Sequence, residues 1–306
     1  MGTGKVKSAA ARSHSLSHGA TPSAGAALKT GFLYIVATPI GNLGDLSPRA
    51  TATLKSVATI ACEDTRVTGG MLHRLGISTP MIPYHDHNAE RMRPQILARI
   101  GAGESIALVS DAGTPLISDP GYKLVKDCVE NGINVVPIPG PSAPLAALMA
   151  AGLPTDRFYF GGFLPNKTKA RRAVLVGVKS LDATLVYFES PHRLGATLLD
   201  MAETLGEREA AVGREITKLH EEFKRGNLIS LSEFYRETRV RGEVVIVVGA
   251  GGESAQDIPI DIDAALIDAL KTLSVRDAAD AVAKAAGASR REVYSRALKV
   301  SKNRNG

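Results

Sequence analysis

Three loops rich in small residues are the first candidates for a ligand site. They are residues 37–45, 110–121 and 139–143. The first contains Pro39 and Gly41 but matches neither the dinucleotide-binding fingerprint nor a phosphate loop. The second carries Asp111 and Asp119, whose carboxylates could accept hydrogen bonds from an amine or from ribose hydroxyls. A plain turn explains any one of these loops, but three loops after apolar runs favour the ligand crevice of an open α/β sheet.

Two charged segments in the second half of the chain are further candidates. Residues 189–193 and 213–222 each follow an apolar run, and the second is the densest charged block of the sequence. A solvated surface is the usual explanation for such a run. Their position directly after predicted strands nevertheless places them at the edge of a sheet where ligands bind.

Several chemistries are disfavoured by what the sequence contains. His85, His87, Cys62 and Cys128 lack the spacing of zinc ligands, so we expect no metal. No nucleophile elbow or Cys/His arrangement suggests acyl transfer. Two cysteines are too few for a disulfide framework, which favours the reducing cytoplasm. No apolar run reaches the roughly 18 residues of a membrane span, so we expect no membrane partner.

The elements that must position these residues alternate along the chain. In the first half, strands are predicted at residues 32–37, 57–62, 105–110 and 133–138, and helices at 48–56, 91–100 and 121–131. After a helix at 143–151, strands are predicted at residues 158–163, 184–189, 209–213 and 243–249. Strands that alternate with helices indicate an α/β fold with mostly parallel sheets.

Composition shifts divide the chain into five segments. A proline-rich stretch at residues 137–142 and a glycine-rich one at 249–257 mark two boundaries. Two capping boxes, at Ser274 and Ser289, begin helices that read as a helix-turn-helix. We predict a disordered tail over residues 1–30, an N-terminal α/β domain over 31–142, a C-terminal α/β domain over 143–250, a linker over 251–261 and a helix-turn-helix module over 262–306.

The formal charge of +6 is distributed unevenly over the 306 residues. The first thirty residues carry +4 and the segment from Asp261 onward carries +3, so the long middle part is close to neutral at −1. Arg290, Arg291 and Arg296 place cations on the last helix, which suggests contact with nucleic acid; a solvated helical appendage is the alternative.

Many ordered motifs between residues 32 and 250 resemble one family. The matching stretches are residues 38–42, 63–66, 110–121, 139–142, 162–165, 189–193, 213–222 and 241–243. Together they are similar to the bacterial 16S ribosomal RNA 2′-O-methyltransferase I family of the tetrapyrrole-methylase superfamily. The terminal helices also resemble the helix-turn-helix of that family.

The resemblance implies two α/β domains that hold S-adenosylmethionine between them, and commonly a homodimer. The implied substrate is a cytidine ribose in the decoding region of 16S ribosomal RNA in the small subunit, methylated on its 2′-oxygen. The residues implied to contact the cofactor are Pro39, Gly41, Ser110, Asp111, Gly113, Thr114, Ile117, Ser142, Ala143, Leu164 and Pro191. Tetrapyrrole methylases tend to carry an aspartate at the position of Thr114, and we expect Asp111 to substitute for it.

Methylation of a ribose hydroxyl requires loss of its proton, and a positioned base contributes typically about 10²- to 10⁴-fold. The candidates are Glu189, His192, Glu215 and Lys218. We favour Glu215 with Lys218, because a neighbouring cation keeps the carboxylate ionised and lysine can also contact phosphate.

RNA binding requires a basic surface, and the body offers one patch without an acid in it: Lys167, Lys169, Arg171 and Arg172. We expect this patch, taken as a loop, and the C-terminal module to contact phosphates. Two other functions stay open at this point. One is a tetrapyrrole C-methyltransferase, such as one acting on uroporphyrinogen or precorrin; the other is a non-catalytic regulator whose helix-turn-helix binds DNA.

Overall fold

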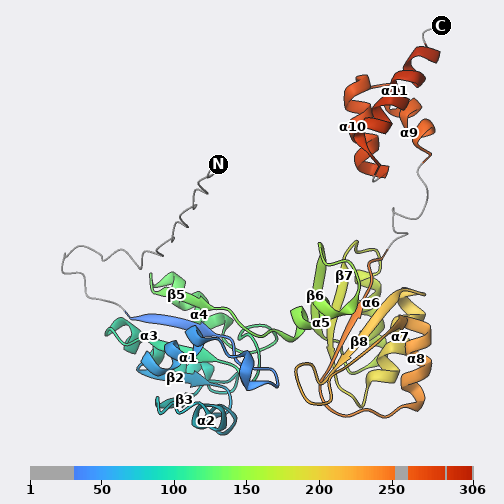
Figure 1. Cartoon of the computed structure of the whole chain (residues 1–306). Helices are drawn as coiled ribbons and strands as arrows, with labels where there is room; N and C mark the ends of the chain where they lie inside the picture. Colours follow the sequence, from blue (N-terminus) through green and yellow to red (C-terminus); the bar gives the residue numbers. More distant parts are fainter. Residues whose placement is uncertain (1–30, 252–260, 287, 305–306) are drawn as a thin grey trace, which may run out of the picture.

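The computed structural model describes residues 31–251, 261–286 and 288–304. This part of the chain forms two five-stranded sheets, each covered by helices, and a module of three helices near the C-terminus (Figure 1). The predicted tail over residues 1–30 and most of the predicted linker lie outside the described residues. No helix in the described ranges is long and apolar enough to cross a membrane.

The first sheet is entirely parallel, with strand order β3-β2-β4-β1-β5. Its strands are β1 (Phe32–Val36), β2 (Thr59–Cys62), β3 (Met81–Pro83), β4 (Ile106–Val109) and β5 (Asn134–Ile138). The helices of this half are η1 (Leu43–Asp45), α1 (Pro48–Ser56), α2 (Thr65–Arg74), α3 (Ala89–Gly101) and α4 (Tyr122–Glu130).

Burial on both faces explains why β2 and β4 read as continuous apolar runs. On β2, Ile60 and Cys62 pack with α1 and α2 on one face, whereas Ala61 packs with α3 and α4 on the other. The alternation of side chains along a strand therefore divides the core into two layers, one on each side of the sheet. Such double-sided packing holds the carboxyl ends of the strands, and the loops after them, in fixed positions.

The second sheet is mixed, with strand order β6-β7-β10-β8-β9. Its strands are β6 (Phe158–Phe163), β7 (Thr184–Glu189), β8 (Glu209–Arg214), β9 (Glu222–Asn227) and β10 (Val244–Val248). The helices of this half are α5 (Ala143–Ala151), α6 (Thr168–Val178), α7 (Leu194–Leu205) and α8 (Leu228–Glu237).

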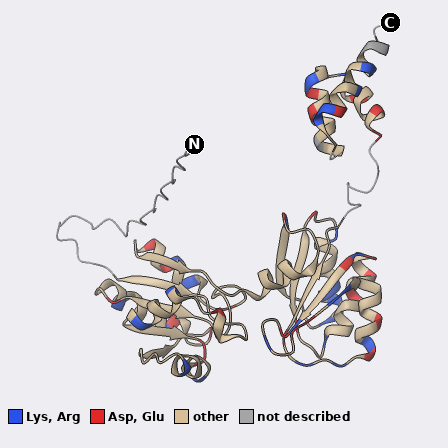
Figure 2. Cartoon of the chain, in the orientation of Figure 1, with Lys and Arg blue, Asp and Glu red and all other residues tan. Residues whose placement is uncertain are grey.

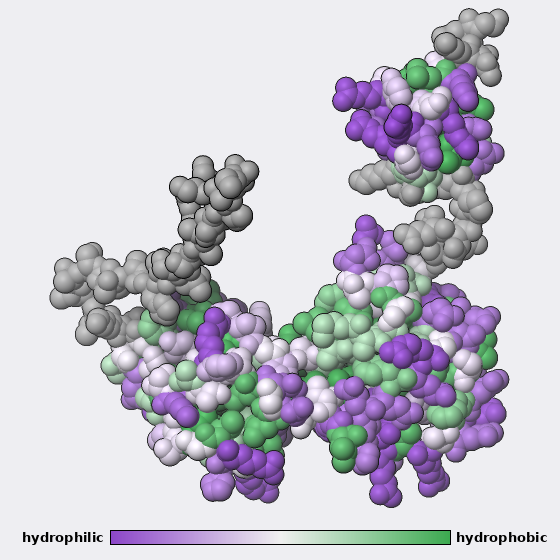
Figure 3. Space-filling model, viewed as in Figure 1, coloured by the Kyte–Doolittle hydropathy of each residue, from purple (hydrophilic) through white to green (hydrophobic). Residues whose placement is uncertain are grey.

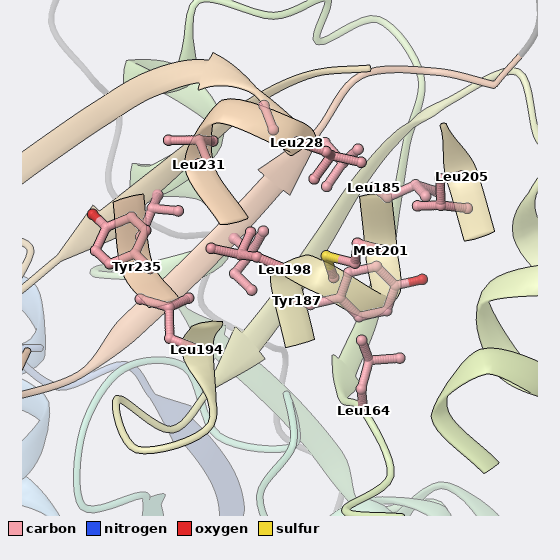
Figure 4. Packing of buried hydrophobic residues seen from close by; sticks show 14 of the residues in the cluster. Leu164, Leu185, Tyr187, Leu194, Leu198, Met201, Leu205, Leu228, Leu231 and Tyr235 are labelled. Carbon is pink, nitrogen blue, oxygen red and sulfur yellow. The ribbon is translucent and has the colours of Figure 1, made fainter. Parts of the chain in front are cut away.

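Each face of the second sheet has its own apolar layer. Leu185, Leu198, Leu231 and Tyr187 belong to the larger layer, in which α6, α7 and α8 pack on the sheet (Figure 4). Helix α5 covers the opposite face, where its side chains pack with β7, β8 and β10. Ile40, from the loop after β1, is buried in this second layer, so the core of the second sheet includes a residue of the first half.

The predicted α/β fold with mostly parallel sheets is confirmed, but the second sheet departs from it. Only β6 and β7 pair in parallel there, whereas β10 runs antiparallel to both of its neighbours and β8 pairs antiparallel with β9. Strand β9 is not among the predicted strands, because its charged residues are typical of a solvated surface segment. Its place at the edge of the sheet explains this composition, since charged side chains on an edge strand oppose unwanted pairing.

The C-terminal module consists of α9 (Ile262–Ala269), α10 (Val275–Ala286) and α11 (Arg290–Arg304). Leu266, Val282 and Val293 bring the three helices together around one small core. The predicted cap of α10 is confirmed, because the Ser274 hydroxyl accepts a hydrogen bond from the Asp277 backbone N–H at 3.2 Å. Hydrophilic residues cover most of the visible face of this module (Figure 3).

Candidate active site

The three small-residue loops of the first half are tied to one another by hydrogen bonds. The backbones of Thr38 and Gly113 form a two-way bridge, with N···O distances of 2.8 and 3.0 Å. The Thr38 hydroxyl also donates to the carbonyl of Ser110 at 3.2 Å, and the Thr114 hydroxyl donates to the carbonyl of Pro141 at 2.9 Å. The loops predicted to share one edge of the sheet therefore form a single rigid unit.

A cavity of about 370 Å³, the main cavity below, lies between this loop unit and the second sheet. Its lining residues are Ile40, Ala112, Gly113, Thr114, Ile117, Ser118, Asp119, Ser142, Ala143, Pro144, Phe163, Phe188, Glu189, Ser190, Pro191, Gly242, Glu243, Val244 and Val245. Apolar and small residues predominate, with a few polar groups, as is usual for sites that bind organic ligands. None of these lining residues is Lys or Arg, whereas three are acidic, so the cavity suits a cationic or neutral ligand better than a phosphate.

The loop over residues 110–121 has unusual backbone geometry where it borders the main cavity. Leu116 and Ser118 have φ values of +73° and +67°, in the left-handed region that few residues other than glycine adopt. Gly113 has a φ of +84°, and a Cβ there would come within 3.2 Å of the Ile40 side chain. Backbone strain of this kind is concentrated at ligand sites, where the surrounding structure enforces it.

Six of the residues predicted to contact a cofactor line the main cavity: Gly113, Thr114, Ile117, Ser142, Ala143 and Pro191. Pro39, Gly41 and Asp111 line a second cavity of about 260 Å³ instead. Ser110 and Leu164 are buried and line neither cavity; Leu164 belongs to the core of the second sheet (Figure 4). Asp111, expected to replace the missing aspartate at position 114, is therefore not at the main cavity.

Glu189 lines the main cavity, but its carboxylate is fully engaged. It accepts hydrogen bonds from the Ser190 backbone N–H at 2.6 Å and from the Thr197 hydroxyl at 2.5 Å, and it forms an ion pair with Arg193. Its side chain is completely buried. This carboxylate therefore holds the turn that carries Ser190 and Pro191 to the cavity. His192 is exposed and lines none of the cavities described here.

Glu215 and Lys218 do form the predicted ion pair, at 2.8 Å. Lys218 also contacts the carboxylate of Glu243 at 3.0 Å, and a Glu215 oxygen accepts the Glu243 backbone N–H at 2.9 Å. The hydrogen bond from Lys218 holds the pKa of Glu215 below its ordinary value. Burial lowers the pKa of Lys218, but the bonds to the two glutamates outweigh it and raise that pKa overall. The pair is therefore held ionised, and neither member lines the main cavity.

The Glu215–Lys218 pair also contacts the first half of the molecule. The Lys218 side chain lies over Gly41, where an added Cβ would come within 2.4 Å of the lysine Cγ. Glu215 has a φ of +50° and packs on Gly242, which has a φ of +92°. A Cβ at Gly242 would lie 2.3 Å from the glutamate oxygen. Gly41 thus allows Lys218 to pack closely across the two halves, and Gly242 allows Glu215 to pack closely within the second half.

Asp119 was noted in the sequence as a hydrogen-bond acceptor but not as an acid–base candidate. It lines the main cavity and is half-buried. Burial raises its pKa above the ordinary 3.8; the Ser110 hydroxyl lowers the pKa in part, and Asp111 raises it further. In the sequence, the only indication of a special role for Asp119 is that Pro120 and Gly121 follow it, and this pattern is equally typical of an ordinary turn.

The basic patch predicted as a loop is the start of helix α6, and Arg171 is not available to RNA in this conformation. Arg171 is 3% exposed, and its guanidinium donates to the Asp200 carboxylate at 2.6 Å. Arg172 pairs with Asp200 and Glu203, both on α7. The sequence around this patch contains no acid, because the acids that pair with it, Asp200 and Glu203, come from the next helix, α7. Lys167 and Lys169 are exposed, with no ion pair among the described residues.

Two of the three arginines predicted to bind RNA on α11 are paired within the module. Arg290 pairs with Asp280 of α10, and Arg296 lies 3.8 Å from Asp263 of α9. Arg291 is exposed and has no ion-pair partner in the described part of the chain. Figure 2 shows the cations and acids of this module interspersed rather than gathered into one basic face.

Metal-binding residues do not gather anywhere in the described ranges, where no group of three or more His, Cys, Asp or Glu could hold an ion. Cys62 and Cys128 are both buried free thiols.

Comparison with known families gives two matches that together cover most of the chain. Residues 32–232 match the family of Tetrapyrrole (Corrin/Porphyrin) Methylases. Residues 256–301 match the RsmI C-terminal HTH domain. The first match covers the first sheet and the second sheet up to the start of α8, leaving out β10, and the second covers the helical module up to residue 301.

Comparison with curated proteins finds strong similarity over most of the chain. A ribosomal RNA small subunit methyltransferase I of Mesorhizobium japonicum is 48% identical over 270 residues, which are 88% of this chain and 92% of that protein. A protein of the same name from Synechocystis sp. is 45% identical over 276 residues, 88% of this chain and 98% of that protein.

Solved structures share the fold at low sequence identity. Diphthine synthase aligns with a TM-score of 0.57 at 15% identity, over 72% of this chain and 90% of that one. Cobalt precorrin-4 methyltransferase aligns with a TM-score of 0.54 at 16% identity, over 71% of this chain and 94% of that one. A uroporphyrin-III C-methyltransferase of Thermus thermophilus, in complex with S-adenosyl homocysteine, aligns with a TM-score of 0.50 at 19% identity, over 72% of this chain and 97% of that one.

Proposed function

The chain belongs to the ribosomal RNA small subunit methyltransferase I family of tetrapyrrole methylases, and we propose that it transfers a methyl group from S-adenosylmethionine to the 2′-oxygen of a cytidine ribose in the decoding region of 16S ribosomal RNA. The observation that carries this proposal is the main cavity, which is built jointly by both sheets and is lined without cations. Membership of the family makes the protein a methyltransferase. We propose, in addition, which atom and which nucleotide it methylates.

The main cavity fits the chemistry of this methyl donor. When bound, S-adenosylmethionine supplies an electrophilic methyl group on a positively charged sulfur. The acidic and apolar lining, with no Lys or Arg, favours such a cation, since an opposite charge nearby stabilises it and a like charge does not. Small residues at Gly113, Ser142 and Ala143 allow the backbone to approach a ligand closely.

We assign proton removal to Asp119. The reaction forms a bond between the ribose 2′-oxygen and the methyl carbon, breaks the bond between that carbon and sulfur, and releases the hydroxyl proton. Asp119 lines the main cavity, and its raised pKa makes it a stronger base than an ordinary aspartate. Glu215 is a weaker candidate because its pKa is lowered, and Glu189 because its carboxylate is already hydrogen-bonded.

Glu215 and Lys218 would then act as a positioning pair. Lys218 bridges Glu215, which follows β8, and Glu243, which precedes β10. It also packs on Gly41 of the first half. By fixing the loop after β1 against the second sheet, the pair would keep the two walls of the main cavity in register. Alignment of the reacting atoms is a large part of the acceleration of such a transfer, since effective molarity depends on it.

The partners follow from the same proposal. Lys167, Lys169 and Arg291 are exposed cations that could contact phosphates of the small ribosomal subunit. We also propose a homodimer; the exposed apolar side chains of Leu145 and Met149, one turn apart on α5, support it. The reaction would take place in the cytoplasm, where bacterial ribosomal subunits are assembled.

One assay distinguishes this function from its competitors. Purified protein is incubated with tritiated S-adenosylmethionine and with small ribosomal subunits from a strain that lacks the modification; uroporphyrinogen III serves as the alternative acceptor. We expect label in the ribosomal RNA, mapped by nuclease digestion to a single 2′-O-methylcytidine. Label in the tetrapyrrole alone would favour a C-methyltransferase, and no label together with tight binding to operator DNA would favour a regulator.

A further inference from the structure

A second and a third cavity lie at the carboxyl edge of the first sheet. The second, of about 260 Å³, is lined by Pro39, Gly41, Leu43, Val67, Thr68, Gly70, Met71, Arg74 and Asp111. The third, of about 470 Å³, is lined by Glu63, Asp64, Thr65, Arg66, Pro83, His85, His87 and Asp111. They share Asp111, whose next neighbours in the chain, Ala112 and Gly113, line the main cavity. A group held in the third cavity would therefore lie at the same edge of the first sheet as the loop that borders the main cavity.

The acidic residues of the third cavity differ in what they already bind. The Asp64 carboxylate caps α2 by accepting the Arg66 backbone N–H at 2.8 Å, and it pairs with the Arg66 guanidinium at 2.6 Å. An Asp111 oxygen accepts the Asp64 backbone N–H at 3.0 Å. These two carboxylates shape the turn between β2 and α2. Glu63 lies at the start of the same turn, and its carboxylate has no hydrogen-bond partner among the described residues.

The surroundings of Glu63 favour a ligand that donates hydrogen bonds. Burial raises the pKa of Glu63, and the charges of Asp111 and Asp119 raise it further, which shows that the turn faces the same end of the sheet as the proposed base. A buried polar atom on the wall of the third cavity, His85 Nδ1, also lacks a partner among the described residues. The Thr68 hydroxyl of the second cavity lies against the Cys62 thiol. Unsatisfied buried groups are rare in native proteins, and a ligand in the third cavity would give His85 Nδ1 a partner.

We propose, on the basis of the function proposed above, that the third cavity receives the base of the target nucleotide and that the Glu63 carboxylate accepts a hydrogen bond from the exocyclic amino group of cytosine. Acidic side chains are the ordinary acceptors for this amino group. Uracil carries a carbonyl oxygen at the same position, which would face the carboxylate without a proton between them. Glu63 is thus a specificity-determining residue, whereas Asp111 positions the turn that carries it.

The test compares two acceptors and two variants. Small subunits with the target cytidine, and subunits in which uridine replaces it, are methylated by the wild type, by Glu63→Gln and by Glu63→Asp. We expect the wild type to prefer cytidine by at least about 10-fold in kcat/KM. Glu63→Gln should lose about 10-fold on cytidine and gain on uridine, because the amide can donate to the uracil oxygen. Glu63→Asp should be slower on cytidine while keeping the preference.

The control is Glu237→Gln, an exposed glutamate on α8 that lines none of the three cavities and should leave both rates unchanged. Affinity for S-adenosylhomocysteine, measured by calorimetry, should be the same for all variants and shows that each is folded. A cytidine preference in Glu63→Gln within about twofold of the wild type would overturn the inference. A wild type that methylates neither acceptor would overturn the proposed function itself, and the inference with it.

Discussion

At the scale of single residues, burial decides which acids can act as bases. Glu189, Glu215 and Asp119 all lie near the junction of the two halves, yet only Asp119 both lines the main cavity and has a raised pKa. Sequence spacing pointed to the other two because each follows a strand. Their hydrogen-bond partners could not be inferred from spacing, since Thr197 and Glu243 are brought to them by other elements.

We expect Asp119→Asn to reduce kcat by about 10²- to 10⁴-fold with little change in affinity for S-adenosylhomocysteine. In the wild type, kcat should rise with pH through a pKa above 3.8, because only the ionised carboxylate accepts the proton. Rate measurements from acid to neutral pH with saturating substrates test both statements. An Asp119→Asn enzyme with wild-type kcat would rule out this base.

The raised pKa of Asp119 also has a consequence for stability. A carboxyl whose pKa is higher in the folded than in the unfolded state stabilises the protein below the unfolded value, and this contribution is lost as pH rises through the folded value. Asp119→Asn cannot ionise at this position, so the variant does not lose stability in this way as the pH rises. The variant should therefore melt at a higher temperature than the wild type at pH 7, and the difference should shrink toward pH 3.5. Calorimetric scans at the two pH values give the comparison; a lower Tm at pH 7 would contradict it.

Arg171 is expected to be structural rather than a contact for RNA. Arg171→Ala leaves the buried Asp200 with only Arg172, and we expect a loss of about 3 kcal/mol in the free energy of unfolding. Arg172→Ala, at a side chain 43% exposed, should cost clearly less. Urea denaturation measures both. Equal losses in the two variants would show that the buried arginine does not contribute more to stability than the exposed one.

At the scale of elements, the apolar strands and their loops were predictable, and two charged elements of the second half were not. The runs at β2, β4 and β10 are buried along their whole length, and the sequence shows them directly. Strand β9 and the start of α6 are charged, and each owes its place to a partner element: β8 for the strand, and α7 for the helix. Such partners are distant in sequence, so a pattern read along the chain does not reveal them.

The exposed lysines at the start of α6 provide an element-level test of RNA binding. Reversing the charge at Lys167 and Lys169 together should raise the KM for ribosomal subunits by about 10-fold or more and reduce its dependence on salt, because fewer counterions are released. Affinity for S-adenosylhomocysteine should not change. Lys126→Glu on α4, an exposed lysine outside every proposed site, is the matched control. An unchanged KM in the double variant would remove this surface from the RNA site.

Helix α11 allows a separate test, because one of its arginines is free and its neighbour is paired. Arg291→Glu should weaken binding to small subunits and lower the slope of log affinity against log salt by about 1. Arg290→Gln mainly removes the pair with Asp280 within the module and should change the slope less. Filter binding over a range of salt concentrations measures both variants. Identical slopes for Arg291→Glu and the wild type would contradict a phosphate contact there.

At the scale of the whole molecule, the net charge of +6 is a poor guide to where RNA binds. The body is nearly neutral, and four of the seven cations predicted to contact RNA are paired with acids: Arg171, Arg172, Arg290 and Arg296. What the sequence did identify is the chemistry, through three loops that the fold ties into one wall. The other wall comes from the second sheet, and the distance between the walls depends on contacts such as Lys218 on Gly41. Those contacts join residues far apart in the chain and became visible only in the folded structure.

The central claim is that the methyl donor lies between the two sheets, with the target nucleotide beside it at the edge of the first. A crystal structure with S-adenosylhomocysteine tests it most directly. We expect the ligand in the main cavity, with its sulfur near Asp119 and its other atoms against Gly113, Ser142 and Ala143, and the third cavity open to the acceptor. Ligand bound in the second or third cavity, or contacting only one of the two sheets, would contradict the account.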